Sequence, residues 1–193
     1  NGTLVLKKCS IYMNLSYNGE HCIYVYGNLT LLNTLITAYN TSNHYRIIAY
    51  PESTLRIENC EISYGGYEEY SYPFLYIYSA IYIKYTSNML IKNTTICSSG
   101  SDAINVWSDN AKIVNCTIEN NAGDGIFLYE AHNTKIKGCR IANNSKGVYI
   151  GARSSNNIIE SCTITNNSIG IYLENCTNNI ILYNNITNNQ YGI

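Results

Sequence analysis

The sequence predicts an all-β chain wound into a right-handed parallel β-helix of about eight coils, and two observations carry this prediction. The phrase NCTIENNAGDGIFL at residues 115–128 returns as GCRIANNSKGVYI, SCTITNNSIGIYL and a shorter NNITNNQYGI. One isoleucine also recurs in every repeat, with final steps of 22, 23, 23 and 22 residues, at Ile11, Ile36, Ile62, Ile96, Ile118, Ile141, Ile164 and Ile186. Repeats of this length bury their apolar faces against their neighbours, as in solenoids.

Each repeat contains three short segments of alternating apolar residues and no helical periodicity. In one repeat these segments are 111–113, 116–118 and 126–128. Because residues i and i+2 of a strand face the same way, Cys116 and Ile118 are expected to point inward and Phe127 outward. We expect coils of ~22–26 residues with three strands each. The Asn-Asn pairs and Gly125 are expected to supply the positive-φ corners.

The coils differ in length along the chain. The first two are slightly long, so small loops are expected near residues 12–20 and 40–44. The third carries a tyrosine-rich insertion at about 63–80, which either binds a partner or covers the flank of the solenoid. We interpret residues 1–193 as a single domain. Neither end shows a capping helix, so we expect the solenoid to be open-ended. Either a longer chain continues it, or another subunit stacks on its end.

The cadence Asn-x-x-Ile, Cys/Asn-x-Ile-x-Asn-Asn and Gly-Ile-x-Leu resembles the parallel β-helix repeats of NosD-like and pectate-lyase-like proteins. The resemblance covers the whole chain and is closest from Ser87 onward. It implies the fold strongly. It leaves the function open, since that superfamily mixes polysaccharide lyases and hydrolases with surface proteins and adhesins.

Composition narrows the classes of function. A formal net charge of -1 gives no electrostatic footprint for nucleic acid, and no apolar run is long enough for a membrane span in this chain. Ten Asn-x-Ser/Thr sequons exceed the number expected by chance and favour an extracellular or cell-surface glycoprotein. The composition, rich in Asn, Tyr and Ile and poor in charge, resembles that of archaeal surface proteins. Frequent use of asparagine and threonine in the turns of the repeat would also create sequons by coincidence. The candidate glycosylation sites are Asn14, Asn28, Asn40, Asn93, Asn143, Asn166, Asn175 and Asn185.

Two columns of similar residues are predicted to be structural. The cysteine column holds inward-facing thiols at Cys9, Cys60, Cys116, Cys139 and Cys162. In-register parallel side chains are poorly placed for disulfides, so we expect free, buried thiols. The second column stacks the Asn-Asn pairs as an amide ladder. No Cys-x-x-Cys motif occurs and the three histidines fall on separate coils, so we expect no metal or cofactor site.

Asp102 and Asp124 are the catalytic candidates, because they occupy equivalent positions in adjacent coils. Repulsion between two close carboxylates would raise the pKa of one of them. Acid/base cleavage of a polysaccharide requires such a carboxyl group. A purely structural preference for Asp at this corner, neutralised by Lys146, is the competing interpretation. Outward aromatic residues form a candidate contact surface for glycans or a neighbouring molecule, namely Trp107, Phe127, Tyr129, Tyr149 and Tyr172, with Tyr67, Tyr70 and Tyr72 in the insertion.

Three functional hypotheses follow from these features. The first is an exported, N-glycosylated β-helix of a cell-surface or filamentous assembly, which binds glycans or forms a homo-oligomer or polymer by end-to-end or lateral contact. The second is a polysaccharide lyase or glycoside hydrolase that uses Asp102 and Asp124. The third is a viral tail-fibre or adhesin segment. The scarcity of acids makes an enzyme the less favoured of the first two.

Overall fold

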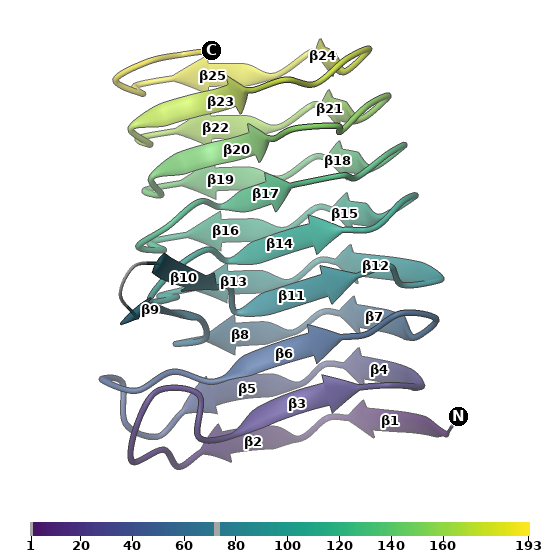
Figure 1. The fold of residues 1–193 in the computed structure, drawn as a ribbon, viewed down its shortest axis with the longest axis vertical. Helices are drawn as coiled ribbons and strands as arrows, with labels where there is room; N and C mark the ends of the chain where they lie inside the picture. Colours follow the sequence, from purple (N-terminus) through teal and green to yellow (C-terminus); the bar gives the residue numbers. More distant parts are fainter. Residues whose placement is uncertain (1, 72–73) are drawn as a thin grey trace.

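The computed structural model describes residues 2–71 and 74–193, with side chains described outside 69–77. The chain winds into a stack of coils that rises from the N-terminus to the C-terminus (Figure 1). Three parallel sheets run along the stack, and each coil contributes one strand to each sheet, except that the last coil lacks a named third strand. The predicted all-β solenoid of about eight coils is therefore confirmed.

Sheet A and sheet B hold eight strands each and sheet C holds seven. Sheet A consists of β1 (Thr3–Lys7), β4 (Asn28–Leu32), β7 (Thr54–Glu58), β12 (Asn88–Lys92), β15 (Lys112–Val114), β18 (Lys135–Lys137), β21 (Ile158–Glu160) and β24 (Ile180–Leu182). Sheet B consists of β2 (Ser10–Met13), β5 (Leu35–Ala38), β8 (Glu61–Ser63), β13 (Thr95–Cys97), β16 (Thr117–Glu119), β19 (Arg140–Ala142), β22 (Thr163–Thr165) and β25 (Asn185–Thr187). Sheet C consists of β3 (Cys22–Val25), β6 (Arg46–Ala49), β11 (Ile81–Lys84), β14 (Ile104–Trp107), β17 (Ile126–Leu128), β20 (Lys146–Ile150) and β23 (Ile169–Leu173).

The core is built from columns of identical or similar aliphatic side chains. In sheet B, Ile96 pairs in register with Ile118, and Ile118 pairs with Ile141. Sheet A carries the matching column five residues earlier, through Ile113 and Ile136. All five of these isoleucines are fully buried. The period found in the sequence is thus the period of the coil.

Two of the three expected strands in the 111–128 repeat lie one residue further along than predicted. They span Lys112–Val114 and Thr117–Glu119, while Ile126–Leu128 agrees with the prediction. Ala111 and Cys116 still face the core and are buried. The alternation therefore predicts the facing of each side chain better than the ends of each strand.

The corners between sheets B and C are formed as predicted by asparagine but not by glycine. The first Asn of each pair has positive φ, at Asn120, Asn143, Asn166 and Asn188. Gly125 does not have positive φ, so that prediction is wrong. A Cβ on Gly125 would instead lie 2.6 Å from the carbonyl oxygen of Gly147 and 2.9 Å from Ile141 Cγ2. Glycine is needed there because neighbouring coils approach closely.

A further set of left-handed residues turns the corner between sheets A and B. Its members are Lys8, Asn33, Asn59, Asn93, Asn115, Gly138, Ser161 and Tyr183. Half of the set is asparagine, whose short amide side chain tolerates this conformation. The sequence reasoning did not assign this role to these positions.

The insertion in the third coil contains an antiparallel hairpin. Its strands are β9 (Tyr67–Ser71) and β10 (Phe74–Tyr78), and they project from the corner between β8 and β11 (Figure 1). The two smaller loops of coils 1 and 2 lie between β2 and β3 and between β5 and β6. All of the extra chain thus leaves the solenoid at the corner that leads into sheet C.

The two predicted structural columns are present. All eight cysteines are free, and Cys60, Cys116, Cys139 and Cys162 of the cysteine column are buried while Cys9 is half-buried. In the amide ladder, the Asn121 side chain donates to Asn144 Oδ1 at 2.9 Å. Asn144 in turn donates to Asn167 Oδ1 at 3.2 Å. The ladder therefore satisfies amides that the corner would otherwise bury without partners.

Across the described residues, the chain has no helix long and apolar enough to cross a membrane.

Candidate functional site

Aromatic side chains line the outer face of sheet C. One position on each strand of this sheet forms an in-register lane, which we call the aromatic lane: Tyr24, Ile48, Tyr82, Asn105, Phe127, Tyr149 and Tyr172. Trp107 and Tyr129 lie beside it, two residues further along their coils. The strands hold this face in place because each member from Ile48 to Tyr149 is flanked on both sides by buried core residues.

The rings of this face touch one another along the solenoid. Phe127 stacks on Tyr149 with a centroid distance of 4.5 Å, and Trp107 lies 4.4 Å from Tyr129. Tyr149 meets Tyr172 edge to face at 5.1 Å. The indole nitrogen of Trp107 donates to Asn105 Oδ1 at 2.8 Å. The face is therefore a nearly continuous aromatic surface with fixed ring orientations.

Asp102 and Asp124 lie one rung apart at the corner that precedes sheet C. The backbone amide of Asp124 donates to Asp102 Oδ1 at 2.7 Å, and the amide of Lys146 donates to Asp124 Oδ1 at 3.0 Å. Each carboxylate thus accepts from the backbone of the next coil, whereas the side-chain oxygens of the asparagine ladder accept from the backbone of the preceding coil. The two residues are 5% and 7% exposed, so they are less open to solvent than an outer-face position implies.

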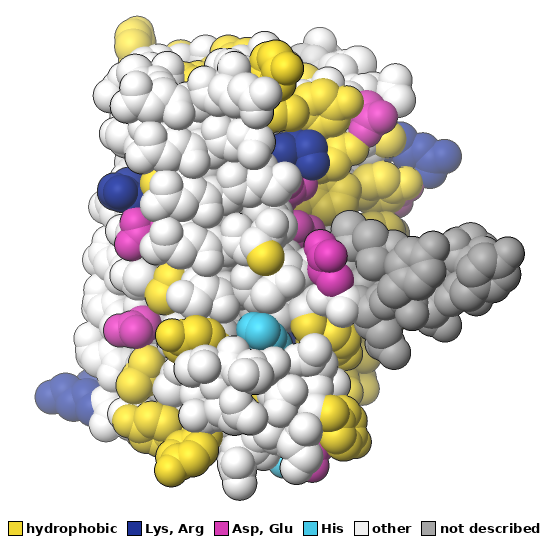
Figure 2. All heavy atoms as spheres, turned by 90° about the vertical axis from the view of Figure 1, so that its left-hand side faces the viewer, with side chains coloured by type: hydrophobic (Ala, Val, Ile, Leu, Met, Phe, Trp, Pro, Cys, Tyr) yellow, Lys and Arg dark blue, Asp and Glu magenta, His cyan; other side chains and the backbone are white. Residues whose placement is uncertain are grey.

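Burial controls the charge state of this pair. Burial and the neighbouring Asp124 carboxylate raise the pKa of Asp102 to about 7. Burial also raises the pKa of Asp124, while the Lys146 ammonium opposes that rise. Lys146 Nζ lies 3.3 Å from Asp124 Oδ2 and 4.8 Å from the Tyr149 ring centroid. The pair therefore adjoins the aromatic lane through Lys146, and Figure 2 shows charged side chains beside apolar ones on this side of the molecule.

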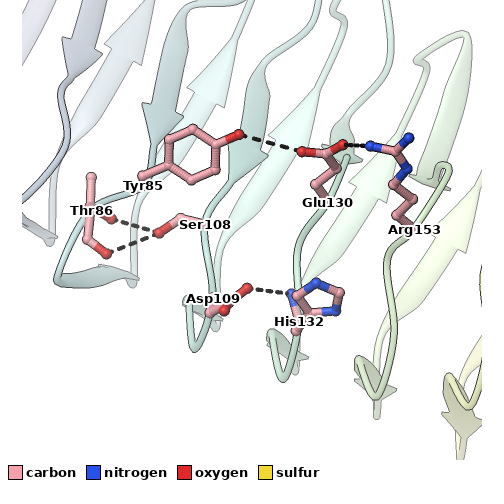
Figure 3. Close-up of a pocket in the computed structure, with 7 residues that line it drawn as sticks. All are labelled: Tyr85, Thr86, Ser108, Asp109, Glu130, His132 and Arg153. Carbon is pink, nitrogen blue, oxygen red and sulfur yellow. Dashed lines mark hydrogen bonds and ion pairs between the residues drawn. The ribbon is translucent and has the colours of Figure 1, made fainter.

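A polar groove at the opposite edge of sheet C was not found by sequence reasoning. Its volume is about 590 Å³, and it is lined by Tyr85, Thr86, Ser108, Asp109, Glu130, His132 and Arg153 (Figure 3). Glu130 binds the Arg153 guanidinium at 2.7 Å and accepts from the Tyr85 hydroxyl at 3.4 Å. His132 Nδ1 lies 2.8 Å from Ser155 Oγ. The groove holds several donors and acceptors within reach of one small ligand.

No motif marks these groove residues, because they come from successive coils. A signal is nevertheless present in the period. Asp109 and His132 occupy equivalent positions 23 residues apart, and the His132 amide donates to Asp109 Oδ1. Glu130 and Arg153 are also 23 residues apart and form an ion pair. A search for polar or charged residues one repeat length apart in the sequence would therefore have predicted that the members of each pair lie together.

The remaining predicted site residues, the tyrosines of the insertion and the candidate glycosylation asparagines, belong to neither the aromatic lane nor the groove. Tyr67 begins the hairpin and packs against Tyr78 with a centroid distance of 4.7 Å. The side chain of Tyr70 and all of Tyr72 lie outside the described residues. The eight candidate glycosylation asparagines are all exposed. In the described part of the chain, no three His, Cys, Asp or Glu side chains are grouped so as to hold a metal ion.

The comparisons identify the class of protein. Residues 47–193 match the family model described as "right handed beta helix region". This match covers most of the chain, so the chain belongs to that family. No curated protein is similar enough in sequence to count as a relative.

Two solved structures with a similar fold are epimerases by name. A periplasmic alginate epimerase AlgG has 16% sequence identity and a TM-score of 0.71, over 95% of this chain and 54% of that one. The A-module of mannuronan C-5 epimerase AlgE4 from Azotobacter vinelandii has 14% identity and a TM-score of 0.57, over 96% of this chain and 55% of that one. This chain thus spans just over half the length of either structure. At these identities the likeness shows the fold.

Proposed function

We propose that this chain is an exported β-helix that binds polysaccharide along the outer face of sheet C. The observation that carries the proposal is the aromatic lane, with Trp107 and Tyr129 beside it. Sugar rings pack their apolar faces on aromatic rings. Because the rings of Phe127, Tyr149 and Tyr172 occupy successive rungs ~4.8 Å apart, an extended chain of sugars can contact several of them at once.

Polar groups on both sides of the aromatic lane support this proposal. On one side lie Asp102, Asp124 and Lys146, and on the other lies the groove with Glu130 and His132. Hydroxyl groups of a sugar need such donors and acceptors at the rim of an apolar contact. The polysaccharide epimerases named above share the fold, which supports a carbohydrate ligand class.

Affinity measurements with variants test the proposal. A panel of neutral and acidic polysaccharides would be screened by affinity electrophoresis and titration calorimetry. The double variant Trp107→Ala/Tyr129→Ala should weaken binding at least tenfold, which corresponds to a loss of about 1.4 kcal/mol or more of ring contact. Tyr183→Ala is the matched control, since that ring is 86% exposed and lies away from sheet C. Binding to no polysaccharide, or equal losses in both variants, would contradict the proposal.

N-glycosylation forms part of the proposal and is supported by exposure. All eight candidate asparagines are exposed, and several lie at left-handed corners, including Asn93, Asn143, Asn166 and Asn175. A glycan on Asn143 would remove one donor from its hydrogen bond to Asn120 Oδ1. Intact mass before and after glycosidase treatment of the chain from its native host measures occupancy. An unmodified mass would contradict this part of the proposal.

An enzymatic function is the second candidate, and the raised pKa of Asp102 favours it. A carboxyl group with a pKa of about 7 can donate a proton near neutral pH, and Asp124 beside it can remain ionised through Lys146. The test is a screen for cleavage or epimerisation of uronate and neutral glycans, with Asp124→Asn as the comparison. Absence of turnover on every polymer that the chain binds would exclude this candidate.

A further inference from the structure

A second cavity lies on the outer face of sheet C beside the hairpin. Its volume is about 360 Å³, and its walls include Tyr82 and Trp107 from the sheet and Tyr78 from the hairpin. It also contains two cations, Arg46 of β6 and Lys84 of β11. We call it the cationic cleft.

Arg46 is held in place by aromatic rings rather than by a carboxylate. Its guanidinium carbon lies 4.5 Å from the ring centroid of Tyr78 and 5.6 Å from that of Tyr82. Its Nε donates to the carbonyl oxygen of Ser79 at 3.5 Å. Burial lowers the pKa of Arg46, yet a guanidinium stays charged at physiological pH. The cleft therefore presents a fixed, half-buried positive charge.

Neither cation of the cleft has an acidic partner among the described residues. Within the described part of the chain, the cations that form ion pairs are Arg56, Lys135, Lys137, Arg140, Lys146 and Arg153. Withdrawing an unpaired charge from water is unfavourable, and an anion that enters the cleft relieves that cost. Among the described residues, the cleft thus holds positive charge without a matching negative charge.

One further donor points to an oxygen-rich ligand. Asn105 lines the cleft, and its Oδ1 is occupied by the Trp107 indole at 2.8 Å. This fixes the amide so that Nδ2 is directed elsewhere, and Nδ2 has no partner among the described residues. A ligand with several acceptor oxygens could bind Asn105, Arg46 and Lys84 together.

We propose that the cationic cleft binds the anionic group of an acidic sugar, a carboxylate or a sulfate ester, while the sugar ring packs against Trp107 or Tyr82. This inference rests on the proposed polysaccharide-binding function and specifies the charge of the polymer. Arg binds planar carboxylates and sulfate oxygens through two donors, which gives the site its directionality. The aromatic lane leads away from the cleft and holds the rest of the sugar chain.

Matched polymers test the charge requirement. Polygalacturonate would be compared with its fully methyl-esterified form, and dextran sulfate with dextran, by titration calorimetry. The charged member of at least one pair should bind at least tenfold more tightly, and its affinity should fall as salt rises from 50 to 500 mM, because salt screens the contact. The pair that shows the difference identifies carboxylate or sulfate as the group. Equal binding of the charged and neutral members of both pairs would overturn the inference and leave the proposed function standing.

Matched variants locate the site. Lys84→Met should weaken binding of the charged polymer about tenfold and leave the neutral polymer unaffected. Arg46→Lys keeps the charge but loses the paired donors, so a smaller loss of about threefold to tenfold is expected. Lys92→Met is the control, since Lys92 is a half-buried, unpaired lysine on the outer face of sheet A. Losses with Lys92→Met equal to those with Lys84→Met would overturn the inference.

Folding and the wider proposal are checked separately. Circular dichroism and thermal unfolding of each variant confirm that the solenoid is intact. If no polymer binds the wild-type chain, the proposed function fails, and titration of free galacturonic acid and of a glucose sulfate by NMR then decides the cleft alone. Shifts of Asn105 and Trp107 side-chain signals that are absent in Lys84→Met would support the cleft. Absence of such shifts with both ligands would overturn it.

Discussion

Two adjacent asparagines divide the work of each corner between sheets B and C. Asn143 adopts a left-handed backbone conformation and is exposed. Asn144 is buried, accepts from the amide and side chain of Asn121 and donates to Ile118 O at 3.2 Å. The first residue therefore satisfies a backbone requirement, and the second satisfies buried hydrogen bonds.

This division predicts different costs for neighbouring substitutions. Asn144→Ala should lower the free energy of unfolding by about 2–4 kcal/mol, because it leaves the Asn121 amide and the Ile118 carbonyl buried without partners. Asn143→Gly should change it by less than ~1 kcal/mol, since glycine tolerates positive φ. Urea unfolding measures both. Similar losses in the two variants would contradict the division.

Asp102 makes a prediction about pH. Its native pKa of about 7 lies above the ordinary value near 3.9, so between these values the native state holds a proton that the unfolded state has released. Ionisation therefore lowers stability as pH rises from about 4 to 7. Asp102→Asn keeps the acceptor for the Asp124 amide and removes the charge. Relative to wild type, it should gain roughly 1–3 kcal/mol between pH 4 and pH 8. A variant-to-wild-type difference that does not change with pH in urea unfolding would refute this.

At the scale of the strands, the repeat period predicted most of the fold. The spacing of Ile118 and Ile141 gave the coil length, and alternation gave the facing of Cys116 and Phe127. Periodicity carries this information because in-register stacking places equivalent residues in contact. Strand ends and the hairpin could not be predicted, since they depend on contacts between coils and have no repeat. The site was found in part, because charge pairs such as Glu130 and Arg153 meet only once the register is known.

The glycines at or near the start of the sheet C strands β17, β20 and β23 predict a packing constraint between coils. A Cβ on Gly147 would lie 2.6 Å from Gly170 O and 2.6 Å from Ile164 Cγ2, both in the next coil. Gly147→Ala should therefore lower stability by about 2–4 kcal/mol through displaced backbone.

Gly138→Asn is the matched glycine substitution. Gly138 has φ +63°, and asparagine fills the equivalent position, Asn115, in the preceding coil. This variant should remain within ~1 kcal/mol of wild type. Both variants would be compared by thermal unfolding. Equal tolerance at the two positions would show that the close approach at Gly147 is relieved at little cost.

At the scale of the whole molecule, the strands of each coil pair only with the strands of the adjacent coils. Ile141 is fully buried between the equivalent isoleucines Ile118 and Ile164. Ile186 pairs on one side with Ile164 and is half-buried. Stability in such a chain is close to a sum of coil and interface contributions, so the position of a defect along the stack matters as much as its size.

The same Ile→Ala truncation at two positions of the stack should therefore destabilise different numbers of coils. Ile141→Ala should lower the free energy of unfolding by about 2–5 kcal/mol and accelerate amide exchange in coils on both sides, because two interfaces lose packing. Ile186→Ala should lower it by about 1–2 kcal/mol and accelerate exchange only in the last coil of this chain, where a single interface is affected. Hydrogen exchange read by mass spectrometry measures the reach of each change. Uniform acceleration along the whole chain in both variants would mean that the solenoid unfolds as one unit, and the nearest-neighbour description would then be wrong.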